Sequence, residues 1–231
     1  MTERRGAAII GAGEGISASL ARALAAAGYA VALAARDTAK LSALCAETGA
    51  TAHAVDATDP AAVEALFARL DASHPPLDAV LYNASFRTRG TVAELAHDGV
   101  RQSLMVSAFG GFLVAQQAAR RMLARGRGTI LFTGASASVK GYAQSAPFAM
   151  GKFALRGLAQ SMARELQPQG IHIAHVVIDG GVRSSRRPPD PARPDALLDP
   201  DAIAPTMMAL IAQPRSAWST EVELRPWVET F

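Results

Sequence analysis

Short apolar runs alternate with longer amphipathic segments along the whole chain of 231 residues. The runs have the length of strands and the segments between them have the length of helices, so each strand is followed by a crossover to the next. Repeated βαβ units build a parallel sheet that is covered by helices on both faces. The alternation therefore predicts an α/β protein with a doubly wound, parallel, seven-stranded sheet in a single domain.

The expected elements can be placed by residue number. The strands are expected at Ala7–Gly11, Ala30–Ala35, Thr51–Val55, Ala79–Tyr82, Thr129–Thr133, Ile171–Ile178 and Glu221–Leu224. The helices are expected near Ile16–Ala27, Ala39–Ala46, Ala61–Ala72, Gly99–Ala124, Ala149–Leu166 and Ala202–Ala212. The stretch Arg183–Pro200 is rich in Arg, Pro and Asp and is too long for a simple connection. We therefore expect one domain over residues 1–231, with a mobile lid near residues 183–200.

Composition excludes several classes of function. Half of the residues are apolar, enough for a sizeable core, and the net charge of +3 is too small and scattered to indicate nucleic-acid binding. Cys45 is the single cysteine, so an internal disulfide is impossible, and the five histidines show no metal-ligand spacing. We expect no metal site and no membrane span. The charged N-terminus does not resemble a signal peptide, so a cytoplasmic location is expected.

A glycine-rich turn follows the first expected strand. Gly11, Gly13 and Gly15 allow a sharp turn and a close approach of the backbone to a phosphate group. The helix that begins at Ile16 presents its free N–H groups and positive dipole end at the same place. This strand–turn–helix unit predicts a cradle for the pyrophosphate of a dinucleotide, with Glu14 inside the cradle loop.

The end of the second strand indicates which nicotinamide cofactor is bound. An acidic residue at this point would bind the ribose 2′-hydroxyl of NAD, but here Ala35 is followed by Arg36. A guanidinium suits a 2′-phosphate, so NADP is predicted, with NAD second. Asp37 could pair with Arg36 and weaken this preference.

Taken in order, the motifs resemble those of the short-chain dehydrogenase/reductase family, which implies a Rossmann sheet. Gly11-x-x-x-Gly15-Ile16-Ser17, Asp56-Ala57-Thr-Asp59, Tyr82-Asn83-Ala84-Ser85 and the helix that carries Lys152 are similar to the family's motifs. The resemblance implies homodimers or homotetramers. It also implies cofactor contacts from the following residues: Gly11, Gly13, Glu14, Gly15, Ile16, Arg36, Asp56, Ala57, Asn83, Ala84, Lys152, Gly180, Val182 and Ser184.

The differences between this sequence and the family's motifs occur mainly at the family's catalytic residues. By spacing, Ser107 stands at the family's catalytic Asn, Ala135 at its Ser and Phe148 at its Tyr, while Lys152 is retained. This pattern resembles a divergent branch of the family with Phe in place of Tyr. A phenyl ring cannot donate a proton to a carbonyl oxygen, so we expect a different acid or none.

Three further residues are candidates for the missing chemistry. Ser136 is next to the lost serine, and Tyr142 lies in the loop before the helix of Lys152. Asp179, in an Asp-Gly pair, could favour a cationic substrate, although the pair is equally typical of a turn.

The expected function is that of an NADP-dependent oxidoreductase that acts on a small, apolar, imine-like or conjugated substrate. Hydride addition to a preformed cation needs no acid, which is why imines are preferred over ketones. The alternative, a non-catalytic NADP-binding sensor or scaffold, remains open because the cradle and Lys152 fit both.

Overall fold

The computed structural model describes residues 4–229, and these form one parallel sheet with helices on both faces. The strands are β1 (Gly6–Ile10), β2 (Ala30–Ala35), β3 (Thr51–Ala54), β4 (Leu77–Tyr82), β5 (Gly128–Thr133), β6 (Ile171–Ile178) and β7 (Glu221–Leu224). They lie in the order β3-β2-β1-β4-β5-β6-β7, and every neighbouring pair is parallel. The predicted doubly wound, seven-stranded sheet is confirmed.

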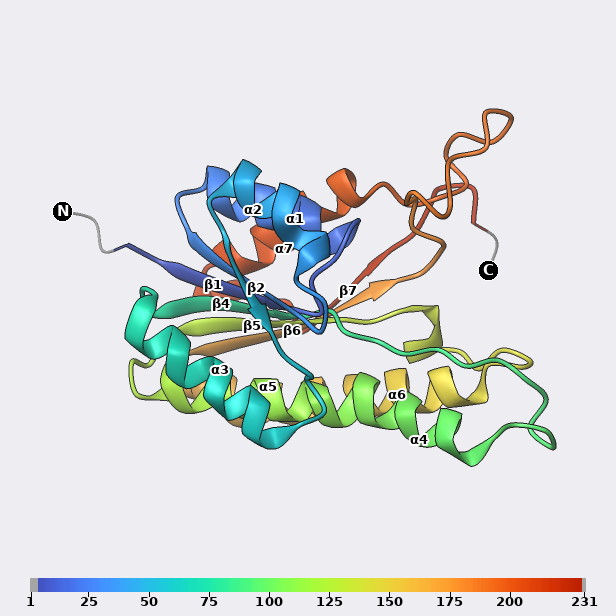
Figure 1. Cartoon of the computed structure of the whole chain (residues 1–231), viewed down its shortest axis with the longest axis horizontal. Coiled ribbons are helices and arrows are strands. Elements are labelled where there is room, and N and C mark those ends of the chain that lie inside the picture. Colours follow the sequence, from blue (N-terminus) through green and yellow to red (C-terminus); the bar gives the residue numbers. More distant parts are fainter. Residues whose placement is uncertain (1–3, 230–231) are drawn as a thin grey trace.

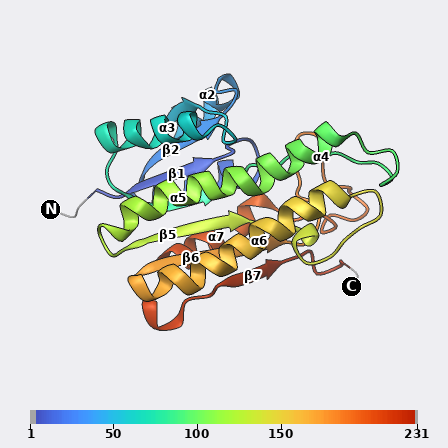
Figure 2. The ribbon, with the colours of Figure 1, turned by 90° about the horizontal axis from the view of Figure 1, so that it is seen from below.

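The helices divide into two layers (Figure 1). One face of the sheet carries α1 (Ile16–Ala26), α2 (Ser42–Thr48) and α7 (Pro200–Ala212). The other carries α3 (Pro60–Ser73), α4 (His97–Leu104), α5 (Gly110–Leu123) and α6 (Ala146–Leu166), and Figure 2 shows α5 and α6 side by side, roughly aligned with β5. No helix within residues 4–229 combines the length and the apolarity needed to cross a lipid bilayer.

Burial on both faces explains the apolar strands. Along β1, Ala8 and Ile10 belong to the core beneath α3, α5 and α6, whereas Ala7 and Ile9 belong to the core beneath α1 and α7. This alternation follows from the two-residue period of a strand. The edge strand β3 is largely exposed and correspondingly less apolar.

Most element boundaries agree with the prediction to within a few residues, and local chemistry explains where they fall. Asp59 caps α3 by accepting hydrogen bonds from the N–H groups of Ala61 and Ala62 at 2.9 and 3.3 Å, and Pro60 occupies the first helical position. Helix α6 begins at Ala146, three residues earlier than expected, with Pro147 in its first turn. Phe148 therefore lies in that first turn.

One expected helix is interrupted. The predicted helix at Gly99–Ala124 is α4, then a π-helical turn at Met105–Phe109, then α5. The Tyr82 hydroxyl donates a hydrogen bond to the carbonyl of Val106 in this turn, and a Cβ at Gly110 would lie 2.5 Å from that hydroxyl. The turn thus gives a buried phenol an acceptor, a requirement that helical periodicity does not reveal.

The segment between β6 and α7 is largely exposed and contains three isolated β-bridges, Val182↔Leu198, Ser184↔Arg187 and Asp190↔Arg193. It lies beyond the carboxyl ends of the strands (Figure 1). Its position suits a lid, and its mobility stays a prediction.

Candidate functional site

The topology places a crevice at the carboxyl ends of the central strands. β1 lies between β2 and β4, so the chain leaves β1 toward one half of the sheet and later returns to the other half. Loops that leave the sheet in opposite directions open a crevice between them, which is where doubly wound sheets bind ligands. Two cavities lie at this edge.

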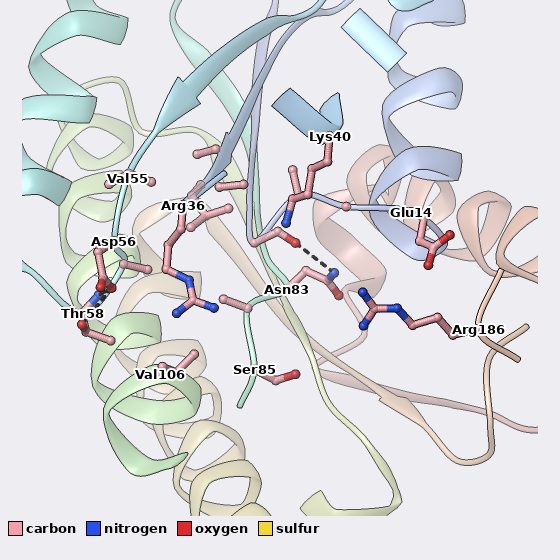
Figure 3. Close-up of a pocket in the computed structure, with 18 residues that line it drawn as sticks. Glu14, Arg36, Lys40, Val55, Asp56, Thr58, Asn83, Ser85, Val106 and Arg186 are labelled. Atoms are coloured by element: carbon pink, nitrogen blue, oxygen red, sulfur yellow. Dashed lines mark hydrogen bonds between the residues drawn. The ribbon is translucent and has the colours of Figure 1, made fainter. Parts of the chain in front are cut away.

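The first, here named the cradle cavity, has a volume of about 550 Å³. It is lined by Ile10, Gly11, Ala12, Gly13, Glu14, Ala34, Ala35, Arg36, Lys40, Val55, Asp56, Ala57, Thr58, Asn83, Ala84, Ser85, Val106 and Arg186 (Figure 3). The ends of β1 to β4 therefore all contribute to one elongated site.

The glycine turn shapes one wall of the cradle cavity. Gly11 has a φ of +84°, and a Cβ there would lie 2.3 Å from the backbone nitrogen of Ala84, so this close approach requires glycine. Gly15, with a φ of +80°, precedes α1 and provides no side-chain cap. The first N–H groups of α1 therefore have no side-chain cap, which is the arrangement found where helix N-termini bind anions.

Three cations reach the cradle cavity from separate segments. Arg36 follows β2, Lys40 lies one turn later, and Arg186 comes from the segment after β6 (Figure 3). Asp37 accepts a hydrogen bond from the N–H of Ala39 at 3.0 Å, and Arg36 has no ion-pair partner within residues 4–229. Asp37 therefore does not pair with Arg36, and it does not weaken the predicted preference for NADP in that way.

Two acids also line the cradle cavity. Asp56 accepts hydrogen bonds from the backbone N–H and the hydroxyl of Thr58 at 2.9 and 2.8 Å, and these bonds lower the pKa of its carboxyl. Glu14 accepts a hydrogen bond from the Ser185 hydroxyl at 2.9 Å. The second bond joins the cradle loop to the segment that follows β6.

The second cavity, here named the Lys152 cavity, has a volume of about 360 Å³. It is lined by Ile16, Asn83, Ser85, Arg87, Thr133, Gly134, Ala135, Ser136, Ala137, Tyr142, Phe148, Lys152, Ile178, Gly180, Val182 and Arg187. Asn83 and Ser85 line both cavities, so the two meet at the loop after β4. The Asn83 amide is fixed there by a 2.8 Å hydrogen bond to the Ser17 hydroxyl.

Lys152 is the buried cation of the second cavity. The residue is 3% exposed, and its Nζ donates to the carbonyl of Thr133 at 2.7 Å. Burial lowers the pKa of this ammonium to about 8. The centre of the Phe148 ring lies 5.9 Å from Nζ, and the Arg87 guanidinium lies 5.0 Å from the same ring.

Asp179 is not open to the Lys152 cavity. Its carboxylate pairs with Lys140 at 3.2 Å and more closely with Arg225, and Ser136 also hydrogen-bonds to it. Burial acts to raise the pKa of this carboxyl, but the hydrogen bonds and the two cations outweigh burial and lower it. The negative charge is therefore already compensated by the protein.

Two other buried polar groups lie outside both cavities. The Ser107 hydroxyl lies in the π turn, where it has no hydrogen-bond partner within the described chain, and it packs against Gly151 of α6. His175 shares Glu221 with Arg156, and burial lowers its pKa to about 4. Neither residue lines either cavity, although His175 packs behind Gly134 of the Lys152 cavity wall.

Comparison with known proteins assigns the chain to a family. The family model described as "short chain dehydrogenase" matches residues 5–189. The chain belongs to the short chain dehydrogenase family. Every residue that lines either cavity falls inside the matched stretch, whereas α7 and β7 lie beyond it.

Individual relatives agree with this assignment. The chain is 35% identical over 168 residues to "Inactive 2-(S)-hydroxypropyl-CoM dehydrogenase 2" of Xanthobacter autotrophicus, which covers 72% of this chain and 73% of the relative. A solved short-chain dehydrogenase from Rhodopseudomonas palustris has 36% identity and a TM-score of 0.85 over 96% of this chain and 99% of that one. A metagenomic short-chain oxidoreductase in complex with NADP has 27% identity and a TM-score of 0.85 over 97% and 98%.

The sites expected from the family's motifs are divided between the two cavities. Gly11, Gly13, Glu14, Arg36, Asp56, Ala57, Asn83 and Ala84 line the cradle cavity, while Ile16, Asn83, Ser136, Tyr142, Phe148, Lys152, Gly180 and Val182 line the Lys152 cavity. Gly15, Ser107, Asp179 and Ser184 line neither. Among the described residues, no cluster of three His, Cys, Asp or Glu side chains could hold a metal ion.

Several cavity residues of this short chain dehydrogenase were not predicted. They are Lys40, Thr58, Ser85, Arg87, Arg186 and Arg187. A signal was present for Lys40, because the chain has only three lysines. Arg186 and Arg187 lie in the expected lid, but sequence alone does not show which lid residues turn inward.

Proposed function

We propose that the protein is an NADP-dependent oxidoreductase of the short chain dehydrogenase family with an incomplete proton-donor set. The observation that carries the proposal is the meeting of the two cavities at Asn83 and Ser85. One cavity offers phosphate-binding groups and the other a buried ammonium, so a single extended dinucleotide could span both.

The cradle cavity fits NADP better than NAD. Arg36 and Lys40 would hold a 2′-phosphate at the end of β2, and the open N-terminus of α1 would hold the pyrophosphate. Nothing lies within 4 Å of a Cβ built at Gly13, so the loop leaves room for this group. When bound, the nicotinamide supplies or accepts a hydride at the Lys152 cavity.

Side chains of the protein must stabilise or protonate the negative charge that develops on the substrate. Phe148 occupies the position beside Lys152 where a phenol would donate a proton, so the ammonium of Lys152 is the buried group that can stabilise a developing oxyanion. Tyr142 lines the same cavity and is 46% exposed, which makes it the candidate proton donor. The Ser136 hydroxyl is engaged with Asp179.

For the substrate we propose a small conjugated or imine-like compound, with the conjugated class preferred. Asp179 no longer supports a cationic substrate, since Lys140 and Arg225 already balance its charge. The wall of the Lys152 cavity is cationic, which favours an acceptor that becomes an enolate over an iminium ion. Ketones, which need a proton at the alkoxide, are expected to react most slowly.

One observation favours the alternative of a non-catalytic NADP-binding protein. Phe148 removes the acid while Lys152 and the cradle remain, and the relative from Xanthobacter autotrophicus carries "Inactive" in its name. This protein would then sense or store NADP. We also propose a cytoplasmic homodimer or homotetramer that pairs through α5 and α6.

The test combines binding with turnover. Calorimetry with NADPH is expected to show binding, and the absorbance of NADPH is then followed with matched sets of enones, cyclic imines and ketones. Consumption with enones or imines, ahead of ketones, supports the oxidoreductase. Normal NADPH binding without turnover of any set would instead favour the non-catalytic protein, and absence of binding would overturn both.

A further inference from the structure

The wall of the Lys152 cavity carries positive charge only. Arg87, Lys152 and Arg187 all line it, and its complete set of lining residues contains no Asp or Glu. The nearest buried acid of this region, Asp179, is already compensated by Lys140 and Arg225. The cavity therefore has an excess of positive charge that the protein does not neutralise.

The two arginines come from different segments of the chain. Arg87 lies in the loop after β4, where its Nη2 donates to the Ser145 hydroxyl at 3.2 Å and its guanidinium lies over Phe148. Arg187 lies in the segment after β6, in a tight turn closed by reciprocal 3.0 Å backbone hydrogen bonds with Ser184. Both residues are exposed and line the cavity, which leaves their remaining N–H groups accessible to a ligand.

Neither guanidinium has an acidic partner within residues 4–229, although acids pair with many other arginines of the chain. Arg22, Arg121, Arg156 and Arg183, for example, all form ion pairs at 2.6 to 2.7 Å. Arg187 is also near enough to contribute, after burial and Arg89, to lowering the pKa of Arg87. Two like charges held together without an acid are stabilised by an anion placed between them.

We propose that the Lys152 cavity binds a substrate that carries a carboxylate, which Arg87 and Arg187 hold at the mouth while the reacting carbon faces Lys152. This rests on the proposed oxidoreductase function and specifies its substrate class. Guanidinium groups match the planar geometry of a carboxylate and bind it by paired, charge-assisted hydrogen bonds. The remaining wall, with Phe148, Ala135 and Ile178, suits a short apolar body.

The test uses conjugated acids and their neutral amides as matched probes: crotonate with crotonamide, and cinnamate with cinnamamide. Each is titrated calorimetrically into the protein at low ionic strength, both alone and saturated with NADP⁺, whose phosphates would fill the cradle cavity and leave Arg87 and Arg187 as the basic groups for the acid. Each acid is expected to bind about tenfold or more tightly than its amide. Added salt is expected to reduce the preference.

Substitutions test whether Arg87 and Arg187 cause the preference for the acid over the amide. Arg87→Gln and Arg187→Gln are each expected to remove most of the preference for the acid, whereas Arg101→Gln, on the exposed surface of α4, is expected to retain it. Equal binding of acid and amide by the wild type, or a preference that persists in both cavity variants, overturns the proposal. The NADP⁺ titration separately tests the nucleotide function, and the titrations without nucleotide still decide the carboxylate site.

Discussion

The ammonium of Lys152 lies 5.9 Å from the centre of the Phe148 ring, with no hydroxyl on that ring. Both residues come from the first two turns of α6 and line the same cavity. A buried ammonium beside an aromatic face is stabilised weakly by the ring, yet burial still lowers its pKa to about 8. Under the proposed function, the chemistry of this site depends on what replaces the proton that a phenol would supply.

Phe148→Tyr is expected to create or raise ketone reduction, by up to about 10²–10⁴-fold if the new phenol acts as a general acid. The measurement is NADPH consumption with a panel of ketones. Phe153→Tyr is the matched control, because this side chain is 44% exposed and lines neither cavity.

The double variant Phe148→Tyr with Ala135→Ser extends this test. Ala135 lines the same cavity, so a hydroxyl there could orient the substrate carbonyl. If the double variant binds NADPH but reduces no ketone, the correspondence between position 148 and the family's catalytic tyrosine is wrong.

Arg36→Asp is expected to narrow or reverse a preference for NADPH over NADH, since it exchanges a 2′-phosphate ligand for an acid that suits a 2′-hydroxyl. Lys40→Met is expected to weaken NADPH alone. Dissociation constants for both cofactors give the result. Arg69→Asp makes the same change of charge on the exposed face of α3 and should leave both constants unaltered. Tighter NADH binding by the wild type would contradict the NADP assignment.

The lowered pKa of Lys152 predicts how the stability of the protein changes with pH. Its pKa is about 8 in the folded protein and about 10.4 in an unfolded chain, so between these values the unfolded state binds the additional proton. The stability of the wild type relative to Lys152→Met is therefore expected to rise from about pH 8 toward pH 10, by up to roughly 3 kcal/mol. Urea denaturation of both proteins across this range measures it. A difference that stays constant with pH would show that Lys152 is not desolvated.

The exposed apolar residues of α5, α6 and the preceding π turn predict self-association. Phe109, Phe112, Met150 and Phe153 are each 37–49% exposed. We expect a dimer or tetramer by light scattering, and we expect Phe112→Glu to shift it toward smaller species. Val92→Glu, at a side chain that is 79% exposed in a loop, is the control. A monomeric wild type at micromolar concentration would exclude the proposed pairing.

Local sequence was sufficient to predict the strands of the sheet and the glycine-rich loop of the cradle cavity. The apolar strands are recognisable because both faces of the sheet are covered, and Gly11 and Gly15 because their backbone needs a positive φ. Arg36 could be placed at the cradle because it directly follows β2.

Contacts between distant residues could not be read in the same way. Asp179 was a candidate for the chemistry, but its partner Arg225 lies 46 residues away and enters through the segment after β7. The π turn depends on the Tyr82 hydroxyl, which meets Val106 only in the folded protein. The same holds for Arg87 and Arg187, which meet at one cavity from loops 100 residues apart in the sequence.

The hydrogen bond between Ser185 and Glu14 joins residues separated by 171 positions. During synthesis the ribosome produces β1 to β4, and with them most of the cradle wall, long before residue 185 emerges. The contact between the cradle loop and the segment after β6 can therefore form only near the end of translation. Any product that stops short of this segment would lack Arg186, the one lining residue of the cradle cavity that comes from it.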